Sequence, residues 1–195
     1  MTSPVEFWFE FASTYSYPTS QRIADEAKRV GRNVLWRPFL LGPIFKQQGW
    51  NDSPFNLYPA KGAYMYRDLE RLCRNHDLPW RKPSSFPRNG LLAARVACAA
   101  LNEPWMPEFA RRVYRANFAH DENISKPDVI LACLTGVAPD PEAALAAGAD
   151  ADAKACLRKH TERAVELGIF GAPSFLVNGE LFWGDDRLAA ALAWH

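Results

Sequence analysis

The chain has 195 residues, of which 48% are hydrophobic and 23% are charged, and 23 lysines and arginines against 22 acids leave a net charge of +1. These proportions are typical of a globular protein, and the length suffices for one large domain or two small ones. The near-balance of charge argues against a broad basic face for nucleic acid or for an anionic membrane. The 7 Trp and 12 Phe exclude a disordered chain.

The N-terminal segment and the cysteines indicate a compartment. The segment has no basic residue, and Glu6 and Glu10 interrupt its apolar run, so it does not read as a signal peptide. No stretch approaches the roughly 18 apolar residues that a membrane span needs. The 4 cysteines include no C-x-x-C pair, which excludes a redox dithiol and a zinc knuckle. We therefore predict a cytoplasmic protein whose cysteines are small buried side chains without a catalytic role.

The first 41 residues predict a βαβ unit. Residues 5–11 alternate between apolar and polar positions with a period of two, which indicates a strand. Residues 16–30 read as a helix that ends at Gly31. Residues 33–41 read as a second strand, parallel to the first, in which Pro38 requires an edge or a bulge.

The middle of the chain predicts helices and almost no strand. Residues 42–59 read as a loop, too long for an ordinary connection and therefore functional. A helix is expected over residues 61–75, with Tyr64, Leu69 and Leu72 facing inward. Further helices are expected over residues 91–101, 108–119, 127–134, 141–147 and 150–167.

The last 22 residues return to strand patterns. Residues 174–177 and 180–183 flank Asn178–Gly179, the strongest hairpin dipeptide, and a short helix follows to residue 193. These strands can complete one sheet with the N-terminal pair only if the helical block is an insertion.

Two short segments could carry chemistry. Ser13 and Ser16 lie where the first strand ends and the first helix begins, a place where free N–H groups and the helix dipole favour an anion. The alternative is that Ser16 caps the helix through Thr19 or Ser20. Pro173 stands at the first position of a strand, where proline is tolerated, and is also a candidate for a cis peptide bond.

The combination of these segments is more specific than either alone. The order of strand, S-x-x-S, helical insertion, GAPSFLV, N-G hairpin and GDDRL resembles the thioredoxin-like superfamily. Within it, the chain is similar to the group of periplasmic-type disulfide oxidoreductases, kappa-class glutathione transferases and 2-hydroxychromene-2-carboxylate isomerases. Ser13 of FASTYSY stands where the oxidoreductases carry the first Cys of C-x-x-C, and Thr14 replaces the Pro of S-P-Y-S or S-P-F-S. NDSPFNLYPAKGAYMYRDLERL also resembles the isomerases.

The resemblance covers essentially the whole chain and implies an α/β fold. A thioredoxin-like βαβ–ββα domain would consist of residues 1–45 and 165–195 and would bind glutathione. Residues 46–164 would form an inserted all-α domain. A homodimer is also implied.

The resemblance gives Ser13 a catalytic role. A serine pair cannot exchange disulfides, but the Ser13 hydroxyl can donate a hydrogen bond to a thiolate that comes from glutathione. Such a bond contributes about 1.5–3 kcal/mol, and one pKa unit corresponds to about 1.36 kcal/mol. Together with the helix N-terminus, Ser13 would therefore lower the pKa of the bound thiol by about one to two units.

Similarity to the kappa class also implies the remaining contacts of the glutathione cofactor. The backbone of Ala172, before a cis Pro173, would bind its cysteinyl main chain. Asp185 and Asp186 would bind its γ-glutamyl ammonium. Lys61 and Asn51 would bind its glycyl carboxylate. A one-residue length difference leaves Asn56 or Trp50 as alternatives to Asn51. Without the resemblance, Asp185 and Asp186 would read as helix caps, and Lys61 as a surface charge.

The implied activity is that of a 2-hydroxychromene-2-carboxylate isomerase. The thiolate would add to a conjugated carbon, the ring would open and a bond would rotate. Glutathione would then leave unchanged from a trans-o-hydroxybenzylidenepyruvate-type acid, an intermediate of naphthalene-like catabolism. Lys46, Arg88 or Lys61 could bind the substrate carboxylate.

Two other functions fit the same sequence. One is a kappa-like glutathione transferase or peroxidase that consumes glutathione. The other is a non-catalytic thioredoxin-like protein that holds extended peptide near Pro173.

No nucleotide-binding motif occurs, and the 4 histidines fit no metal-ligand spacing, so no metal site is predicted. Aromatic residues near the two loops could line a pocket for an aromatic substrate: Trp50, Phe55, Tyr58, Tyr64, Trp80 and Phe86.

Overall fold

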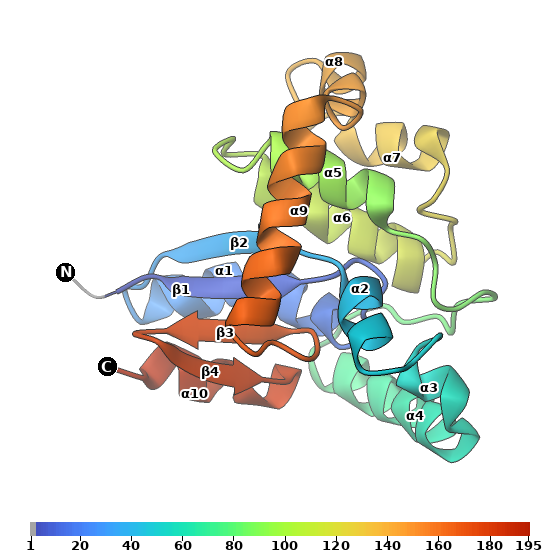
Figure 1. The fold of residues 1–195 in the computed structure, drawn as a ribbon, viewed down its shortest axis with the longest axis vertical. Coiled ribbons are helices and arrows are strands. Elements are labelled where there is room, and N and C mark those ends of the chain that lie inside the picture. Colours follow the sequence, from blue (N-terminus) through green and yellow to red (C-terminus); the bar gives the residue numbers. More distant parts are fainter. Residues whose placement is uncertain (1–2) are drawn as a thin grey trace.

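Four strands form one mixed sheet in the order β2-β1-β3-β4 (Figure 1). The computed structural model describes residues 3–195. The strands are β1 (Val5–Phe9), β2 (Val34–Pro38), β3 (Ser174–Val177) and β4 (Glu180–Trp183). β1 pairs in parallel with β2 and antiparallel with β3, and β3 and β4 form the predicted hairpin. Pro38 ends the edge strand β2, where its missing N–H costs no ladder hydrogen bond.

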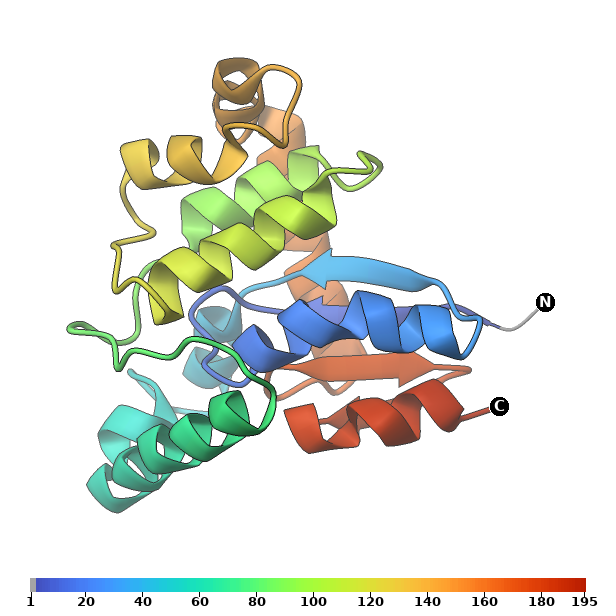
Figure 2. The same ribbon diagram turned by 180° about the vertical axis from the view of Figure 1, so that it is seen from behind.

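The central strand β1 is buried on both faces. Phe7 and Phe9 contribute to the larger core cluster with residues of α1 (Ser16–Arg29) and α10 (Leu188–Ala193). Trp8 points the opposite way and packs against Ala164 of α9 (Ala151–Glu166). Figures 1 and 2 show α1 and α10 on one face of the sheet and α9 on the other. β1 thus has apolar side chains on both of its faces. It ends at Phe9, two residues before the predicted end at Phe11.

The remaining α-helices of residues 3–195 lie in the chain between β2 and β3. They are α2 (Leu41–Gln47), α3 (Pro54–Leu57), α4 (Pro59–Asn75), α5 (Leu91–Ala99), α6 (Met106–Phe118), α7 (Pro127–Leu134) and α8 (Pro141–Ala147), followed by α9, and a short 3₁₀ helix, η1 (Asp185–Arg187), precedes α10. The fold is thus an α/β thioredoxin-like sheet with a helical insertion, as predicted. The division at residues 45/46 and 164/165 stays a prediction.

Two local predictions were wrong. The expected loop at residues 42–59 contains α2 and α3, because Pro54 takes the first position of α3 and the Ser53 side chain accepts a hydrogen bond from the Phe55 N–H. Tyr64 was expected to face inward, but its side chain is 63% exposed and the adjacent Met65 is buried instead.

None of the helices in residues 3–195 combines the length and apolar character needed to cross a bilayer.

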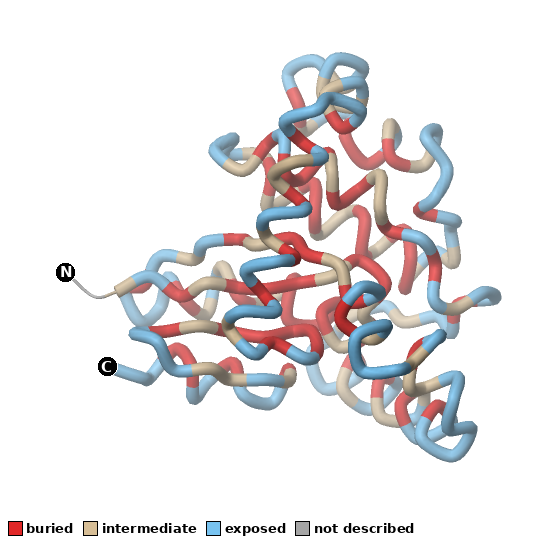
Figure 3. The backbone as a smooth tube through the Cα atoms, in the orientation of Figure 1, coloured by how far each residue is buried: buried red, intermediate tan, exposed pale blue. Residues whose placement is uncertain are grey.

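Buried residues concentrate in the sheet and in the helices that touch it, whereas α3 and α8 contain no buried residue and the outer side of α4 is exposed (Figure 3). The start of β1 and the end of α10 lie at one end of the sheet, and α2 and α4 lie toward the other end (Figures 1 and 2). β1 and β2 run toward that second end, which leaves their carboxyl ends beside the start of α1.

Candidate active site

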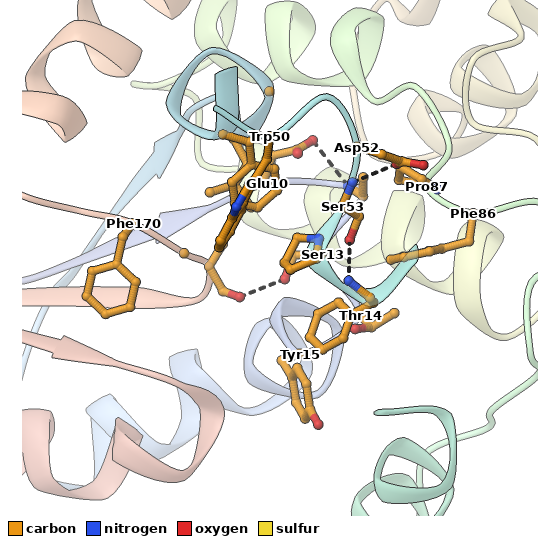
Figure 4. A pocket seen from close by; sticks show the side chains of 18 of the residues that line it. Glu10, Ser13, Thr14, Tyr15, Trp50, Asp52, Ser53, Phe86, Pro87 and Phe170 are labelled. Atoms are coloured by element: carbon orange, nitrogen blue, oxygen red, sulfur yellow. Dashed lines mark hydrogen bonds between the residues drawn. The ribbon is translucent and has the colours of Figure 1, made fainter. Parts of the chain in front are cut away.

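A cleft with a volume of about 1840 Å³ lies at the carboxyl ends of β1 and β2. Its floor is the segment from Glu10 to Tyr15, and its walls come from α2, the loop before α3, α4 and the loops before α5 and β3. Figure 4 shows Ser13 between Trp50 and Phe86. Ligand pockets usually measure about 300–1,000 Å³, so this cleft has room for two small molecules side by side.

Ser13 lies on the floor, directly before α1. Its Oγ donates a hydrogen bond to the carbonyl oxygen of Ala172 at 2.8 Å (Figure 4). It also accepts one from the N–H of Ser16 at 3.3 Å. Ser13 thus satisfies a free N–H at the start of the helix, and the alternative that Ser16 caps it is wrong. Ser16 is the first helical residue and is completely buried, so it does not reach the cleft.

Thr14, which replaces a proline of the related motifs, is also buried. Its hydroxyl donates to Met65 Sδ at 3.1 Å, which ties the loop to α4. Ala172 lines the cleft opposite Ser13, and the Ala172–Pro173 peptide bond is cis, as expected. Pro173 is buried and does not belong to the wall of the cleft, so it shapes the loop without contacting the space that a ligand would occupy.

Asp185 and Asp186 both line the cleft, but their surroundings differ. Asp185 is 7% exposed, and its Oδ1 accepts hydrogen bonds from Thr19 Oγ1 at 2.6 Å and Arg22 Nη2 at 2.7 Å. Asp186 is exposed and pairs with Arg187 at 3.1 Å. Neither side chain caps η1, so the helix-cap alternative is not supported. Asp185 is fixed to α1, and Asp186 presents its charge to the mouth of the cleft.

Lys61 and Asn51 also line the cleft, and both are exposed. Lys61 Nζ lies 5.9 Å from the centre of the Phe55 ring. Trp50 also lines the cleft, whereas Asn56 lies outside its wall and donates to Asp52 and to the Phe86 carbonyl. Of the two alternatives to Asn51, only Trp50 is in a position to contact a ligand.

Arg88 and Lys46, the two other cations proposed for a substrate carboxylate, differ in whether their charge is already paired within the protein. Arg88 is buried, and its guanidinium binds the carboxylate of Asp121 and both oxygens of Asn117. Its donors are therefore committed to the protein. Lys46 is exposed on the cleft wall and, within residues 3–195, has no acidic partner within ion-pair distance.

Glu10 is a site residue that the sequence did not reveal. Its carboxyl group lies on the floor beside Trp50, where it accepts a hydrogen bond from the Ala12 N–H at 3.3 Å (Figure 4). Burial raises the pKa of Glu10 to about 7, and hydrogen bonds from the Ala12 and Leu41 backbones oppose that rise. Glu10 directly follows the last apolar residue of β1, and in the sequence it only marks the end of the apolar segment.

Tyr15 and Trp183 complete the rim of the cleft. The Tyr15 hydroxyl donates to Asp68 at 3.0 Å, and burial together with this carboxylate raises its pKa, so the phenol stays protonated. Trp183 is 52% exposed and lies against Phe170, with 4.8 Å between ring centres. The cleft thus combines a hydroxyl and a helix N-terminus on its floor with charged residues of both signs and aromatic residues on its walls.

Comparisons with known proteins find relatives over almost the whole chain. The chain is 28% identical over 192 residues to the 2-hydroxychromene-2-carboxylate isomerase of Sphingobium xenophagum, covering 96% of this chain and 95% of that protein. It is 30% identical to human glutathione S-transferase kappa 1, covering 94% of this chain and 87% of the human protein. A solved structure of 2-hydroxychromene-2-carboxylate isomerase superposes with a TM-score of 0.80 at 22% identity, covering 95% and 91% of the two chains.

The last likeness shows the fold, and the sequence relatives include both an isomerase and a glutathione transferase. Residues 4–193 match the family described as the DSBA-like thioredoxin domain. This match over almost the whole chain establishes that the chain belongs to the DSBA-like thioredoxin family.

Proposed function

We propose that this protein is a glutathione-dependent isomerase that acts on 2-hydroxychromene-2-carboxylate or a related bicyclic aromatic acid. The observation that carries the proposal is the Ser13 hydroxyl at the start of α1, hydrogen-bonded at 2.8 Å to the carbonyl that precedes the cis proline. A serine here rules out dithiol exchange by the chain itself but retains a donor for a thiolate.

The residues around Ser13 fit a zwitterionic tripeptide. Three residues of the cleft lining match its groups: the Ala172 carbonyl is an acceptor for a main-chain N–H, Asp186 carries a negative charge, and Lys61 carries a positive charge. Asp185 supports Asp186, the next residue, through its bonds to α1. Glutathione would supply the thiolate that adds reversibly to a conjugated carbon of the substrate.

A ligand main chain would change what Ser13 does. Without one, the Ser13 O–H is directed at the Ala172 carbonyl. An N–H from the cysteinyl main chain would bind this carbonyl and let the Ser13 hydroxyl rotate toward the sulfur. The helix N-terminus stabilises the same negative charge, so the two effects together lower the pKa of the thiol by about one to two units.

The rest of the cleft suits a flat aromatic acid. Its walls are mainly apolar, with Phe45, Trp50, Phe55 and Phe86 among the residues that line it. Lys46 is the cation we assign to the substrate carboxylate, because Arg88 is committed to Asp121 and Lys61 is assigned to glutathione. The product would be a trans-o-hydroxybenzylidenepyruvate-type acid, which places the reaction in aromatic catabolism.

The Ser13→Ala variant tests the role of the hydroxyl. We expect the pKa of bound glutathione to rise by about one to two units and kcat/KM at pH 7 to fall about 10- to 100-fold. The thiolate absorbance of the complex, followed against pH, measures the pKa. Ser125→Ala, on an exposed loop outside the cleft, is the matched control and should change neither quantity. An unchanged thiol pKa in Ser13→Ala would refute the assignment.

A transferase or peroxidase remains the second candidate, because human glutathione S-transferase kappa 1 is 30% identical to the chain. The two activities differ in what happens to glutathione. Turnover of the chromene acid with a constant concentration of free thiol supports the isomerase. Loss of one thiol per product formed supports the transferase. Absence of glutathione binding in calorimetry would support the non-catalytic alternative.

A further inference from the structure

A cluster of three potential metal ligands lies outside the cleft, where α5 and α9 meet. The Sγ atoms of Cys98 and Cys156 and one imidazole nitrogen of His160 all lie within 4.8 Å of one another. Cys156 and His160 are four residues apart on α9, so they share one face of that helix. Cys98 comes from α5, 58 positions earlier than Cys156 in the sequence. No ligand spacing in the sequence joins the two segments.

The imidazole of His160 is held in an orientation common among metal-binding histidines. Its Nδ1 lies 3.0 Å from the carbonyl oxygen of Pro38 at the end of β2. A carbonyl only accepts hydrogen bonds, so Nδ1 carries the hydrogen and Nε2 has the free lone pair. Metal-ligating histidines typically donate their other N–H to a carbonyl or carboxylate in this way. Trp8 packs edge-on against the ring at 5.9 Å and fixes its plane.

The spacing of the three groups suits a tetrahedral ion. Bonds of about 2.3 Å to sulfur and about 2.0 Å to nitrogen separate the ligand atoms of a tetrahedral zinc site by about 3.5–3.8 Å. In the structure the ligand atoms lie up to 4.8 Å apart, about 1 Å more than in such a site, and small side-chain rotations can close this difference. Two thiolates neutralise a divalent cation, so no net charge would be added between the helices. Cys98 is buried, whereas Cys156 and His160 are partly exposed and give an ion access from solvent.

We propose that Cys98, Cys156 and His160 form a binding site for a thiophilic divalent cation of the Zn²⁺ type, with its fourth coordination position open to solvent. Three protein ligands with soft or borderline donors favour such an ion over Mg²⁺ or Ca²⁺, which prefer oxygen. On binding, each thiol would release its proton to solvent, and the ion would join α5 to α9. Because α9 leads directly into the segment before Ala172, this link would also hold one wall of the cleft.

Cobalt provides a direct test, because Co²⁺ occupies tetrahedral zinc sites and its absorbance reports the ligands. The untagged protein, freed of metal by chelation and kept reduced with a phosphine, is titrated with Co²⁺ in the absence of glutathione. We expect saturation at one ion per chain, a thiolate-to-cobalt charge-transfer band, and intense visible bands that Zn²⁺ abolishes. Zn²⁺ at 100 times its Kd should raise Tm by about 5–10 °C.

The variants locate the site. Cys156→Ser should weaken Co²⁺ binding about tenfold or more and reduce the charge-transfer band, and His160→Ala should weaken binding but retain that band. Cys156 is partly exposed, so its variant keeps the test interpretable even if Cys98→Ser does not fold. Cys133→Ser, at a buried cysteine outside the cluster, is the control and should bind Co²⁺ like the wild type. Absence of the band in the wild-type protein, or its full retention in Cys156→Ser, would overturn the proposal.

Discussion

Glu10 shows how strongly one partly buried residue can respond to its surroundings. The folded protein raises the pKa of this carboxyl group from 4.5 to about 7, chiefly by removing it from water. Between these two values the folded state keeps a proton that the unfolded state releases. The free energy of unfolding therefore falls as pH rises through this window, and it reaches its lower limit above pH 7.

The free energy of unfolding should reveal this residue. As pH rises from 4.5 to 7, the wild type should lose stability relative to Glu10→Gln, by about 3 kcal/mol for the 2.5-unit shift. Urea unfolding of both proteins at several pH values isolates the effect, because all other titrating groups are shared. Glu103→Gln, at an exposed position, is the control. Parallel curves for the wild type and Glu10→Gln would show that Glu10 is not protonated in the folded protein at pH 5 to 6.

At the scale of elements, an ion pair joins α1 to η1. Arg22 Nη2 and Asp185 Oδ1 are 2.7 Å apart, and their side chains are only 16% and 6% exposed. The pair brings the C-terminal segment against the helix whose N-terminus lies in the cleft. It thereby positions Asp186, the next residue, at the mouth of that cleft.

Removing the cation should cost more here than at the surface. Arg22→Gln leaves a buried carboxylate without its charged partner, and we expect a loss of about 1–3 kcal/mol in unfolding free energy. Arg67→Gln is the matched control, since Arg67 and Glu70 are 56% and 48% exposed, and it should cost less than about 1 kcal/mol. Chemical denaturation measures both. Equal losses would mean that the Arg22–Asp185 pair contributes no more than an exposed pair.

Helices α3 and α4 approach each other through Gly62. A Cβ atom at this position would lie 2.3 Å from the backbone oxygen of Phe55, which a side-chain rotation cannot relieve. Gly62→Ala should therefore separate the two helices, displace the neighbouring Lys61 and weaken glutathione binding in calorimetry. Gly42→Ala, in α2 where a Cβ meets open space, should instead stabilise the fold by about 0.4–1 kcal/mol. Unchanged glutathione affinity in Gly62→Ala would argue against the role of Lys61.

At the scale of the whole molecule, the cleft lies between the end of the sheet and the helices inserted after β2. A ligand that contacts Ser13, Asp186 and Lys61 would connect these two parts, and it would bind only the folded protein. Glutathione at 100 times its Kd should add about 2.7 kcal/mol of stability, or about 5–10 °C in Tm. Scanning calorimetry with and without glutathione measures the shift. Lys61→Ala, compared at the same glutathione concentration, should show a smaller one.

The sequence predicted the parts of the fold that depend on local signals. The β3–β4 hairpin follows from Asn178–Gly179, both of which adopt positive φ, and the parallel pairing of β1 and β2 follows from the helix between them. Helices α2 and α3 were missed because their early prolines and glycine resemble loop composition. Contacts between distant residues, such as Arg22 with Asp185, left no local pattern to detect.

The candidate site divides in the same way. Ser13, Ala172, Asp186 and Lys61 belong to motifs and could be proposed from resemblance, and all of them line the cleft. Arg88 could not be excluded as a substrate contact until its bonds to Asp121 and Asn117 were known. The charge state of Glu10 depends on burial by elements far away in the sequence, which no single segment encodes.

The contact between Gly171 and Trp183 has an optical consequence. A Cβ on Gly171 would lie 2.3 Å from the indole nitrogen, so the ring rests on the backbone one residue before Ala172. The indole is half-exposed at the edge of the cleft, where the polarity of its surroundings changes when water is displaced. Because Trp50 and Trp183 both line the cleft, its occupancy should change the intrinsic tryptophan fluorescence and can be followed in real time without attaching a dye.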